Sequence, residues 1–212
     1  MKELYASWLY DAGYGEIIRI EALTDGCINN TTRLQLDSGL SVILKYNVGA
    51  PADLFHAEAA GLAALSQRQA ARVPAVLRVA DHCLILEDLA CASPGTDYCR
   101  LLGTGLAELH GEHAETFGFT EDNYCGATIQ SNPITRGEHQ FFAEQRIMAL
   151  GLQCLNEGKM RKETVRQLRQ ISDRLDNWVP DFTSVLIHGD LWIGNTHCCA
   201  DGQPALIDPA VY

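Results

Sequence analysis

The chain has 212 residues, of which 47% are hydrophobic, and its formal net charge is -11 at pH 7. This length allows one large domain or two small ones with a substantial core, while the acidic balance argues against a nucleic-acid or membrane-surface partner. The sequence has no apolar run of membrane-spanning length and opens without a signal-type apolar segment, so we expect a cytoplasmic protein with no membrane partner.

The first part of the chain predicts a helix over 1–14, followed by strands over 15–23, 31–36 and 40–46. A short loop of small and polar residues joins the first two strands. Taken alone, this loop is better explained as an ordinary hairpin turn, because it contains only one glycine. Backbone N–H groups in such a loop can also bind phosphate oxygens, and the candidates are Gly26, Cys27, Ile28 and Asn29.

Lys45 ends the third strand, a position at which a lysine is usually solvated. The next segment, 52–69, carries an apolar stripe typical of a helix, and Glu58 lies one turn from both Phe55 and Leu62 on that stripe. A carboxylate on a buried face needs a partner. We therefore predict that Lys45 pairs with Glu58, the arrangement that directs a lysine at nucleotide phosphates in kinases. The alternative is a glutamate at the edge of the stripe.

Two further strands, around 76–79 and 83–87, lead to Glu87, Asp88 and Leu89, whose backbone groups could bind the edge of an adenine base. A change of composition and a Pro-Gly pair follow, which are typical of a domain boundary. We expect an N-terminal nucleotide-binding lobe over 1–89, with its hinge at 87–89. The C-terminal catalytic and acceptor lobe would then occupy 90–212.

The second half of the chain is expected to be mainly helical. A core helix over 97–110 ends at a histidine, which is more typical of a helix end than of a catalytic residue. Helices over 138–157 and 159–178 follow a long polar loop, 117–133. A loop of that length inside a compact domain is usually functional or disordered.

The most informative stretch lies near the end of the sequence. Three apolar residues lead into His188 and Asp190, Asn195 follows five positions after Asp190, and a second apolar triplet, 205–207, delivers Asp208. A hydroxyl acceptor needs a carboxylate to take its proton, and magnesium needs oxygen ligands. We predict that Asp190 is the catalytic base and that Asn195 and Asp208 are metal ligands, with the two triplets as buried strands. The alternative is a hairpin with polar turn residues.

Four segments of the chain match the pattern of a known kinase family. They are 26–29 (Gly-Cys-Ile-Asn), 117–126 (Phe-Gly-Phe through Asp-Asn-Tyr to Gly), 188–195 (His-Gly-Asp-Leu-Trp-Ile-Gly-Asn) and 208–212 (Asp-Pro-Ala-Val-Tyr). Together they resemble the fructosamine kinase, or ketosamine-3-kinase, family, which belongs to the aminoglycoside-phosphotransferase-like branch of the protein-kinase-like fold. The resemblance implies an α+β, bilobal fold, with an N-terminal antiparallel sheet and one helix, and a mainly helical C-terminal lobe with a catalytic hairpin.

The same resemblance implies an enzyme that uses ATP and Mg2+ to phosphorylate the sugar 3-hydroxyl of ketosamines. Fructosamines and ribulosamines, as small molecules or bound to proteins, are the expected acceptors, and the phosphorylation would initiate removal of early glycation adducts. By matching position, the roles of the base, the metal ligands, the phosphate-binding pair and the hinge carry over to the residues named above. The candidates for substrate contacts are His188, Trp192, Asp122, Asn123 and Tyr124.

Two departures from the family pattern affect these expectations. Asp25 stands where many relatives have a second glycine, which could stiffen the phosphate loop. The chain also stops at Tyr212, whereas the relatives continue through further helices. We therefore expect a C-terminal truncation with an incomplete acceptor lobe, which binds ATP, turns over ketosamines poorly and forms a homo-oligomer.

Two other function classes stay open. The chain could phosphorylate another small hydroxylated molecule, such as an aminoglycoside or a choline-like compound, or it could be a non-catalytic remnant that binds nucleotide or a partner. Cys27 is a candidate redox residue, because N–H groups near a thiol favour its thiolate, although an inert small residue in a turn is an equal alternative. None of the eight cysteines stands in a Cys-x-x-Cys pair, so structural zinc is not expected.

Overall fold

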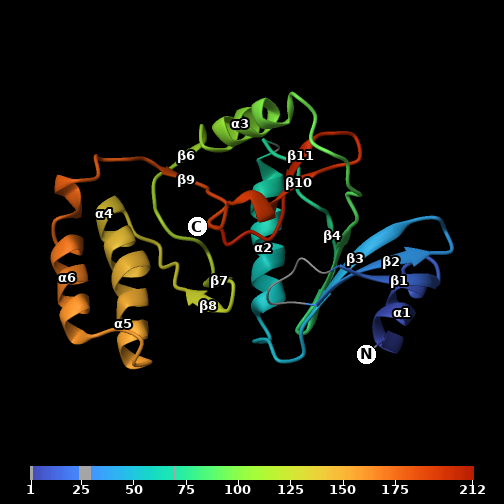
Figure 1. The fold of residues 1–212 in the computed structure, drawn as a ribbon, viewed down its shortest axis with the longest axis horizontal. Helices are drawn as coiled ribbons and strands as arrows, with labels where there is room; N and C mark the ends of the chain where they lie inside the picture. Colours follow the sequence, from blue (N-terminus) through green and yellow to red (C-terminus); the bar gives the residue numbers. More distant parts are fainter. Residues whose placement is uncertain (1, 24–29, 69) are drawn as a thin grey trace.

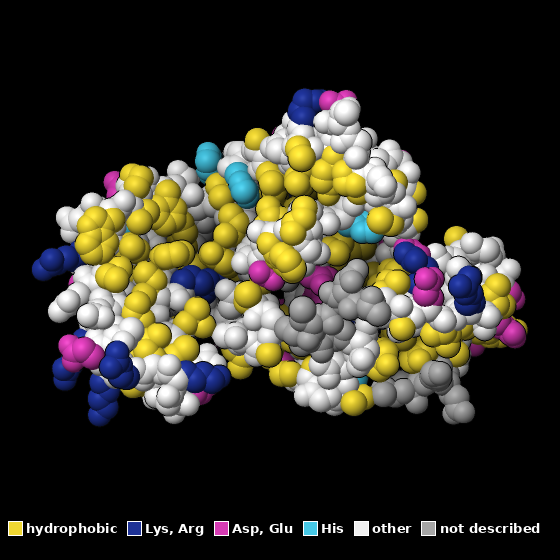
Figure 2. All heavy atoms as spheres, viewed as in Figure 1, with side chains coloured by type: hydrophobic (Ala, Val, Ile, Leu, Met, Phe, Trp, Pro, Cys, Tyr) yellow, Lys and Arg dark blue, Asp and Glu magenta, His cyan; other side chains and the backbone are white. Residues whose placement is uncertain are grey.

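The computed structural model describes residues 2–23, 30–68 and 70–212. One lobe is built on an antiparallel sheet and the other mainly on helices, with the C-terminus between them, beside helix α2 (Figure 1). In the space-filling view, basic side chains gather over the helical end of the molecule (Figure 2). Within the described ranges, no helix has both the length and the apolar character needed to cross a bilayer.

The N-terminal lobe contains a five-stranded sheet with the strand order β1-β2-β3-β5-β4, in which every neighbouring pair is antiparallel. The elements follow the alternation and the helical stripe seen in the sequence, and their bounds lie within a few residues of those predicted. They are α1 (Lys2–Asp11), β1 (Ile17–Leu23), β2 (Asn30–Leu36), β3 (Ser41–Tyr46), α2 (Leu54–Gln67), β4 (Val76–Ala80) and β5 (Cys83–Glu87).

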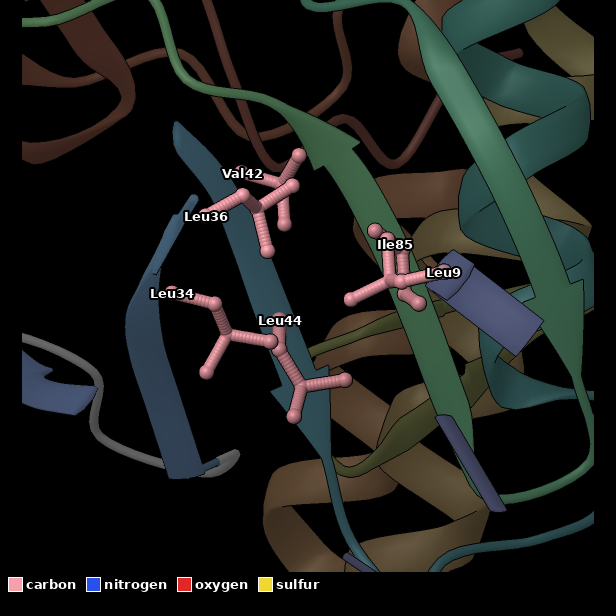
Figure 3. Close-up of a cluster of buried hydrophobic side chains, with 6 residues drawn as sticks. All are labelled: Leu9, Leu34, Leu36, Val42, Leu44 and Ile85. Atoms are coloured by element: carbon pink, nitrogen blue, oxygen red, sulfur yellow. The ribbon is translucent and has the colours of Figure 1, made fainter. Parts of the chain in front are cut away.

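The sheet is covered on both faces, because successive side chains of a strand point to opposite sides. One face packs against Leu9 of α1 (Figure 3), and its buried members are Leu34, Leu36, Val42, Leu44 and Ile85. The other face packs against α2, where Phe55 and Leu62 contact Leu84 and Leu86. Full burial of each such side chain stabilises the fold by about 1.5–3 kcal/mol. Lys45 lies between the buried Leu44 and the strand end, on the face that α2 covers.

The C-terminal lobe combines helices with three two-stranded sheets. Its helical elements are α3 (Tyr98–Leu109), α4 (Glu138–Phe141), the π-helix η1 (Phe142–Met148), α5 (Ala149–Asn156), α6 (Lys162–Ser172) and the 3-10 turns η2 (Leu175–Asn177) and η3 (Ile193–Asn195). The small sheets pair β6 (His113–Ala114) with β9 (Ser184–Val185), β7 (Asn123–Cys125) with β8 (Thr128–Gln130), and β10 (Thr196–Cys198) with β11 (Pro204–Leu206).

Two sequence predictions are wrong in this lobe. The expected long polar loop contains the β7–β8 hairpin, whose strands are too short and too polar to show a clear alternation. The apolar triplet before His188 is not the buried strand expected from the sequence, because it contributes only Val185 to a strand, which pairs with β6. The hairpin near the predicted catalytic loop is β10–β11, which begins directly after Asn195.

The last residues of the chain connect the two lobes. The Ala210 N–H donates to the His188 carbonyl at 2.8 Å, and the Ile187 N–H donates to the Tyr212 carbonyl at 3.3 Å. On its other side this segment meets α2 at Gly61, where an added Cβ would lie 3.3 Å from Pro209 and 3.4 Å from Val211. The small size of Gly61 thus allows α2 to pack closely against residues 209–211, and the two lobes meet there.

Candidate active site

Lys45 is the centre of a three-residue ion cluster that joins the lobes. Its Nζ donates to Glu58 Oε1 at 2.6 Å and to Asp208 Oδ1 at 2.5 Å. Only 5% of Lys45 is exposed, so this ammonium is removed from water and depends on its two partners. The predicted pairing of Lys45 with Glu58 is present in the structure, and Asp208, 163 positions further along the chain, joins the same group.

The electrostatics of the cluster follow from its burial. Burial alone opposes the charge on Lys45, but the nearby carboxylates of Glu58 and Asp208 outweigh it and hold the pKa of Lys45 well above its ordinary value. Burial, together with the negative charge of Asp208, raises the pKa of Glu58 against the pull of Lys45. The cluster therefore keeps a lysine charged at a site from which bulk water is largely excluded.

His188 fixes the backbone of the predicted catalytic loop. The side chain is 2% exposed, its Nε2 lies 2.9 Å from the Ile207 carbonyl, and its Nδ1 accepts the Asp190 N–H at 3.3 Å. These partners define a neutral imidazole that is protonated on Nε2. Burial lowers the pKa of His188, which favours this neutral form. His188 thus links the loop that carries Asp190 to the segment that carries Asp208.

Asp190 is oriented by Asn195. The Asn195 Nδ2 donates to the Asp190 carbonyl at 2.8 Å and to Asp190 Oδ2 at 3.1 Å. Within the described part of the chain, Asp190 Oδ1 and Asn195 Oδ1 have no hydrogen-bond partner. One carboxylate oxygen of Asp190 is therefore held, and the other is available to accept a proton from a hydroxyl group.

The backbone at this site adopts two uncommon conformations. Gly189 has φ +80°, and a Cβ at this position would fall far inside van der Waals contact with the Ala210 carbonyl. Asp208 has φ +56°, in the left-handed region that residues with a Cβ rarely occupy. A strained Asp208 persists only where its surroundings hold it in place, and here the Lys45 ammonium holds its carboxylate.

The oxygen donors at this site suit a hard divalent cation. The Asp208 carboxylate uses one oxygen on Lys45, and the Asn195 amide uses its nitrogen on Asp190, so each has an oxygen to offer. Carboxylate and amide oxygens are ligands that Mg2+ accepts in proteins. The residues present therefore fit the predicted magnesium site.

The hinge residues are held mainly through their side chains. Asp88 accepts hydrogen bonds from Arg33 Nε at 2.6 Å, from Ser41 Oγ at 2.6 Å and from the Ala90 N–H at 3.0 Å. Burial favours the neutral acid, but these hydrogen bonds outweigh it and lower the pKa of Asp88. The Glu87 N–H donates to the Ala75 carbonyl at 2.9 Å. Among the described residues the Leu89 N–H has no acceptor, so this backbone donor at the predicted hinge is unused.

Comparisons with known proteins identify the family. The family model for fructosamine kinase matches residues 3–212. The chain belongs to the fructosamine kinase family. A probable ketoamine kinase of Synechocystis sp. is 35% identical over 208 residues, which cover 93% of this chain and 69% of that protein. The chloroplastic protein-ribulosamine 3-kinase of Arabidopsis thaliana is 28% identical over 216 residues, which cover 97% of this chain and 65% of the relative.

Solved structures support the same family and the wider fold. A Thermobifida fusca protein assigned to the fructosamine-3-kinases superposes with a TM-score of 0.85 at 29% identity, covering 97% of this chain and 73% of that one. Macrolide and aminoglycoside phosphotransferases share the fold at TM-scores of 0.57 and 0.60. These matches confirm the predicted α+β, protein-kinase-like fold. The chain spans about two thirds of the length of the curated fructosamine kinase relatives that it matches.

The tentative substrate residues of the fructosamine kinase pattern have internal partners in this structure. Asp122 Oδ1 accepts the Asn132 N–H at 2.7 Å, Asn123 Nδ2 donates to the Val211 carbonyl at 2.6 Å, and the Tyr124 hydroxyl donates to Asp53 Oδ1 at 2.6 Å. Burial, together with the hydrogen bond to Asp53, raises the pKa of Tyr124 to about 12. These residues and the buried His188 thus have partners within the chain, and their role as substrate contacts stays a prediction.

Trp192 differs from these residues because it is 58% exposed. Its ring covers Gly194, where an added Cβ would overlap the indole atoms, and the Asn195 N–H donates to the Trp192 carbonyl at 3.0 Å. The neighbouring Ile193 is 80% exposed. Trp192 therefore presents an aromatic surface on the same short turn that carries Asn195, close in sequence to Asp190. Its substrate role stays a prediction.

Sequence reasoning missed two residues that organise the site. Arg33 holds Asp88 at the hinge, and its place on a strand beside buried leucines was the only available signal. Arg146, on the π-helix η1, lies 3.9 Å from the Tyr212 ring centre and 4.8 Å from that of Phe141, and it donates to the Ser131 carbonyl at 2.9 Å. No sequence pattern pointed to Arg146. The predicted phosphate-loop residues Gly26, Cys27, Ile28 and Asn29 lie outside the described residues.

Proposed function

We propose that this chain is an ATP-dependent kinase that transfers the γ-phosphoryl group to the 3-hydroxyl of a ketosamine. The observation that carries the proposal is a pair of contacts: Lys45 binds Asp208 across the lobes, and Asp190 binds Asn195. His188 links the two segments through the Asp190 N–H and the Ile207 carbonyl. Membership of the fructosamine kinase family and similarity to a protein-ribulosamine 3-kinase support the choice of acceptor. Such a kinase would initiate the removal of early glycation adducts.

The roles of the residues follow from their partners. The free Oδ1 of Asp190 accepts the proton of the attacking hydroxyl, while Asn195 and the His188-bound backbone N–H fix the carboxylate. Lys45 neutralises phosphate charge, and Glu58 keeps its ammonium in place. Asp208 and Asn195 would hold Mg2+, which supplies charge neutralisation to the phosphates when bound. The Leu89 N–H is the proposed adenine donor at the hinge.

A coupled assay with ATP and a fructosyl-lysine or ribulosyl-lysine acceptor tests the proposal, with the phosphorylated position assigned by NMR. We expect phosphate on the 3-hydroxyl. Asp190→Asn should lower turnover by about 10²–10⁴-fold, because a positioned base contributes that much, and it should leave nucleotide affinity nearly unchanged. The matched control is Asp11→Asn, on α1 at the far face of the sheet, where no loss is expected.

The alternatives give different results in the same assay. Transfer to an aminoglycoside or a choline-like alcohol, with none to ketosamines, would assign the chain to another class of hydroxyl kinase. Nucleotide binding without transfer to any of these acceptors would favour a non-catalytic protein. Ordinary turnover by the Asp190→Asn variant would remove the proposed base from the mechanism.

A further inference from the structure

The β7–β8 hairpin contacts the segment that carries Asp208. Asn123, on β7, is 4% exposed and donates from Nδ2 to the Val211 carbonyl at 2.6 Å, three residues after Asp208. Gln130, on β8, donates from Nε2 to Asn123 Oδ1 at 3.3 Å. Both ends of the Asn123 amide are thus engaged, which fixes its orientation toward the 208–212 segment.

The same hairpin also contacts the start of α2, the helix that carries Glu58. The Tyr124 hydroxyl donates to Asp53 Oδ1 at 2.6 Å, and Asp53 immediately precedes α2. An aspartate at this position usually accepts an N–H from the first turn of its own helix. Here its side chain makes no such bond, so the carboxylate that would cap α2 faces the other lobe instead.

Two adjacent residues of β7 therefore contact the two segments that supply the partners of Lys45, which are residues 208–212 and α2. Asn123 reaches the segment of Asp208, and Tyr124 reaches the helix of Glu58. These two segments already touch at Gly61, which lies against Pro209 and Val211. The β7–β8 hairpin contacts both α2 and residues 208–212, so it forms a second connection between these segments that does not involve Lys45.

We propose that Asn123 and Tyr124 are positioning residues, and that the β7–β8 hairpin holds α2 against residues 208–212 so that Glu58 and Asp208 both reach Lys45. We call this bridging of α2 and residues 208–212 by the β7–β8 hairpin the clamp. Its expected effect on turnover rests on the proposed kinase function, whereas the clamp itself does not. The hairpin thus contacts the Asp208 segment of the C-terminal lobe and the helix of Glu58 in the N-terminal lobe.

Hydrogen–deuterium exchange on the whole chain tests the clamp without reference to activity. Tyr124→Phe deletes only the hydroxyl that binds Asp53. We expect amides in the first two turns of α2 to exchange about 3- to 10-fold faster, the change that corresponds to one lost hydrogen bond, with β1 and β2 unchanged. The matched control is Tyr10→Phe, because Tyr10 is exposed on α1. Unchanged exchange in α2, or equal acceleration across the whole chain, would overturn the proposal.

Partner variants and kinetics extend the test. Asp53→Asn keeps an oxygen acceptor for Tyr124, so we expect near wild-type exchange, whereas Asp53→Ala should match Tyr124→Phe. The double variant Asp53→Ala/Tyr124→Phe should be no worse than either single variant, and additive losses would contradict the direct link. If the wild type transfers phosphate, Tyr124→Phe should lower kcat about 3- to 10-fold with little change in acceptor KM. If the wild type transfers none, the proposed function fails and exchange still decides the clamp.

Discussion

At the scale of single residues, Lys45 shows how far sequence reasoning extends. The position of Glu58 on an apolar helical stripe predicted its pairing with Lys45, because a buried carboxylate needs a partner. The third member, Asp208, could not be predicted at this distance, since it comes from the opposite lobe and has a left-handed backbone. Local patterns identify which residue needs a partner, but a contact across 163 residues depends on how the lobes pack.

Replacing Lys45 with methionine should affect both stability and nucleotide binding. The change leaves Glu58 buried without its cation, which costs roughly 3–5 kcal/mol when one partner of a buried ion pair is removed. Chemical denaturation measures this loss, and nucleotide titration measures binding. Adding Glu58→Gln to Lys45→Met should recover part of the stability but none of the nucleotide affinity. Equal affinity in the wild type and in Lys45→Met would show that the ammonium does not meet phosphate.

Asp88 gives a prediction on pH. Its pKa is lowered in the folded state, so the unfolded chain binds more protons in acid, and the stability that Asp88 contributes is lost as pH falls. We expect the difference in unfolding free energy between the wild type and Asp88→Asn to be constant above about pH 5. It should shrink below the ordinary carboxyl value of about 3.9. A difference that stays the same down to pH 2.5 would contradict the assigned charge state.

At the scale of elements, the sheet and α2 could be predicted because each repeats one simple period over its length. The short pairs β7–β8 and β6–β9 could not be predicted, since two or three residues are too few to show alternation. Their positions depend on tertiary contacts such as the bond from Asn123 to Val211. The regular elements β3 and α2 therefore carry Lys45 and Glu58, while irregular segments carry Asp190 and Asp208.

Gly189 offers a test of how closely the catalytic loop approaches residues 208–212. Gly189→Ala should cost roughly 3 kcal/mol or more, because a left-handed backbone costs about 1–2 kcal/mol and displacement of the Ala210 carbonyl adds to it. Gly202→Ala is the matched control, since Gly202 has φ +79° with open space around it. Thermal unfolding of both variants gives the comparison. Equal losses would show that Gly189 and Ala210 can move apart at no further cost.

At the scale of the whole molecule, two lobes meet at the Lys45 cluster and at the contact of Gly61 with residues 209–211. The bilobal organisation could be predicted from the composition change after residue 89, while the hinge at 87–89 stays a prediction. The way the lobes close could not, because neither the contact at Gly61 nor the hairpin that spans the interface leaves a pattern in the sequence. A ligand bound between the lobes should act on both at once.

Mg2+ with ATP should therefore raise the melting temperature of the whole chain in one transition. At a hundredfold excess over its Kd, a ligand that binds only the folded state stabilises it by about 2.7 kcal/mol. For a chain of this size, that corresponds to a shift of roughly 5–10 °C. Asp190→Asn should keep the shift, because the proposed role of its carboxylate is toward the acceptor, and Lys45→Met should lose it. Two separate transitions, with only one shifted, would show that the lobes unfold independently.

The indole of Trp192 resting on Gly194 constrains how such an enzyme can evolve. The exposed indole proposed to meet the acceptor and the amide proposed to bind the metal belong to one hydrogen-bonded turn, 192–195. A larger side chain at position 194 would lift the indole and tilt Asn195 with it. A change of acceptor is therefore easier to reach by substitutions on other segments, because a substitution at position 194 would disturb both proposed functions at once.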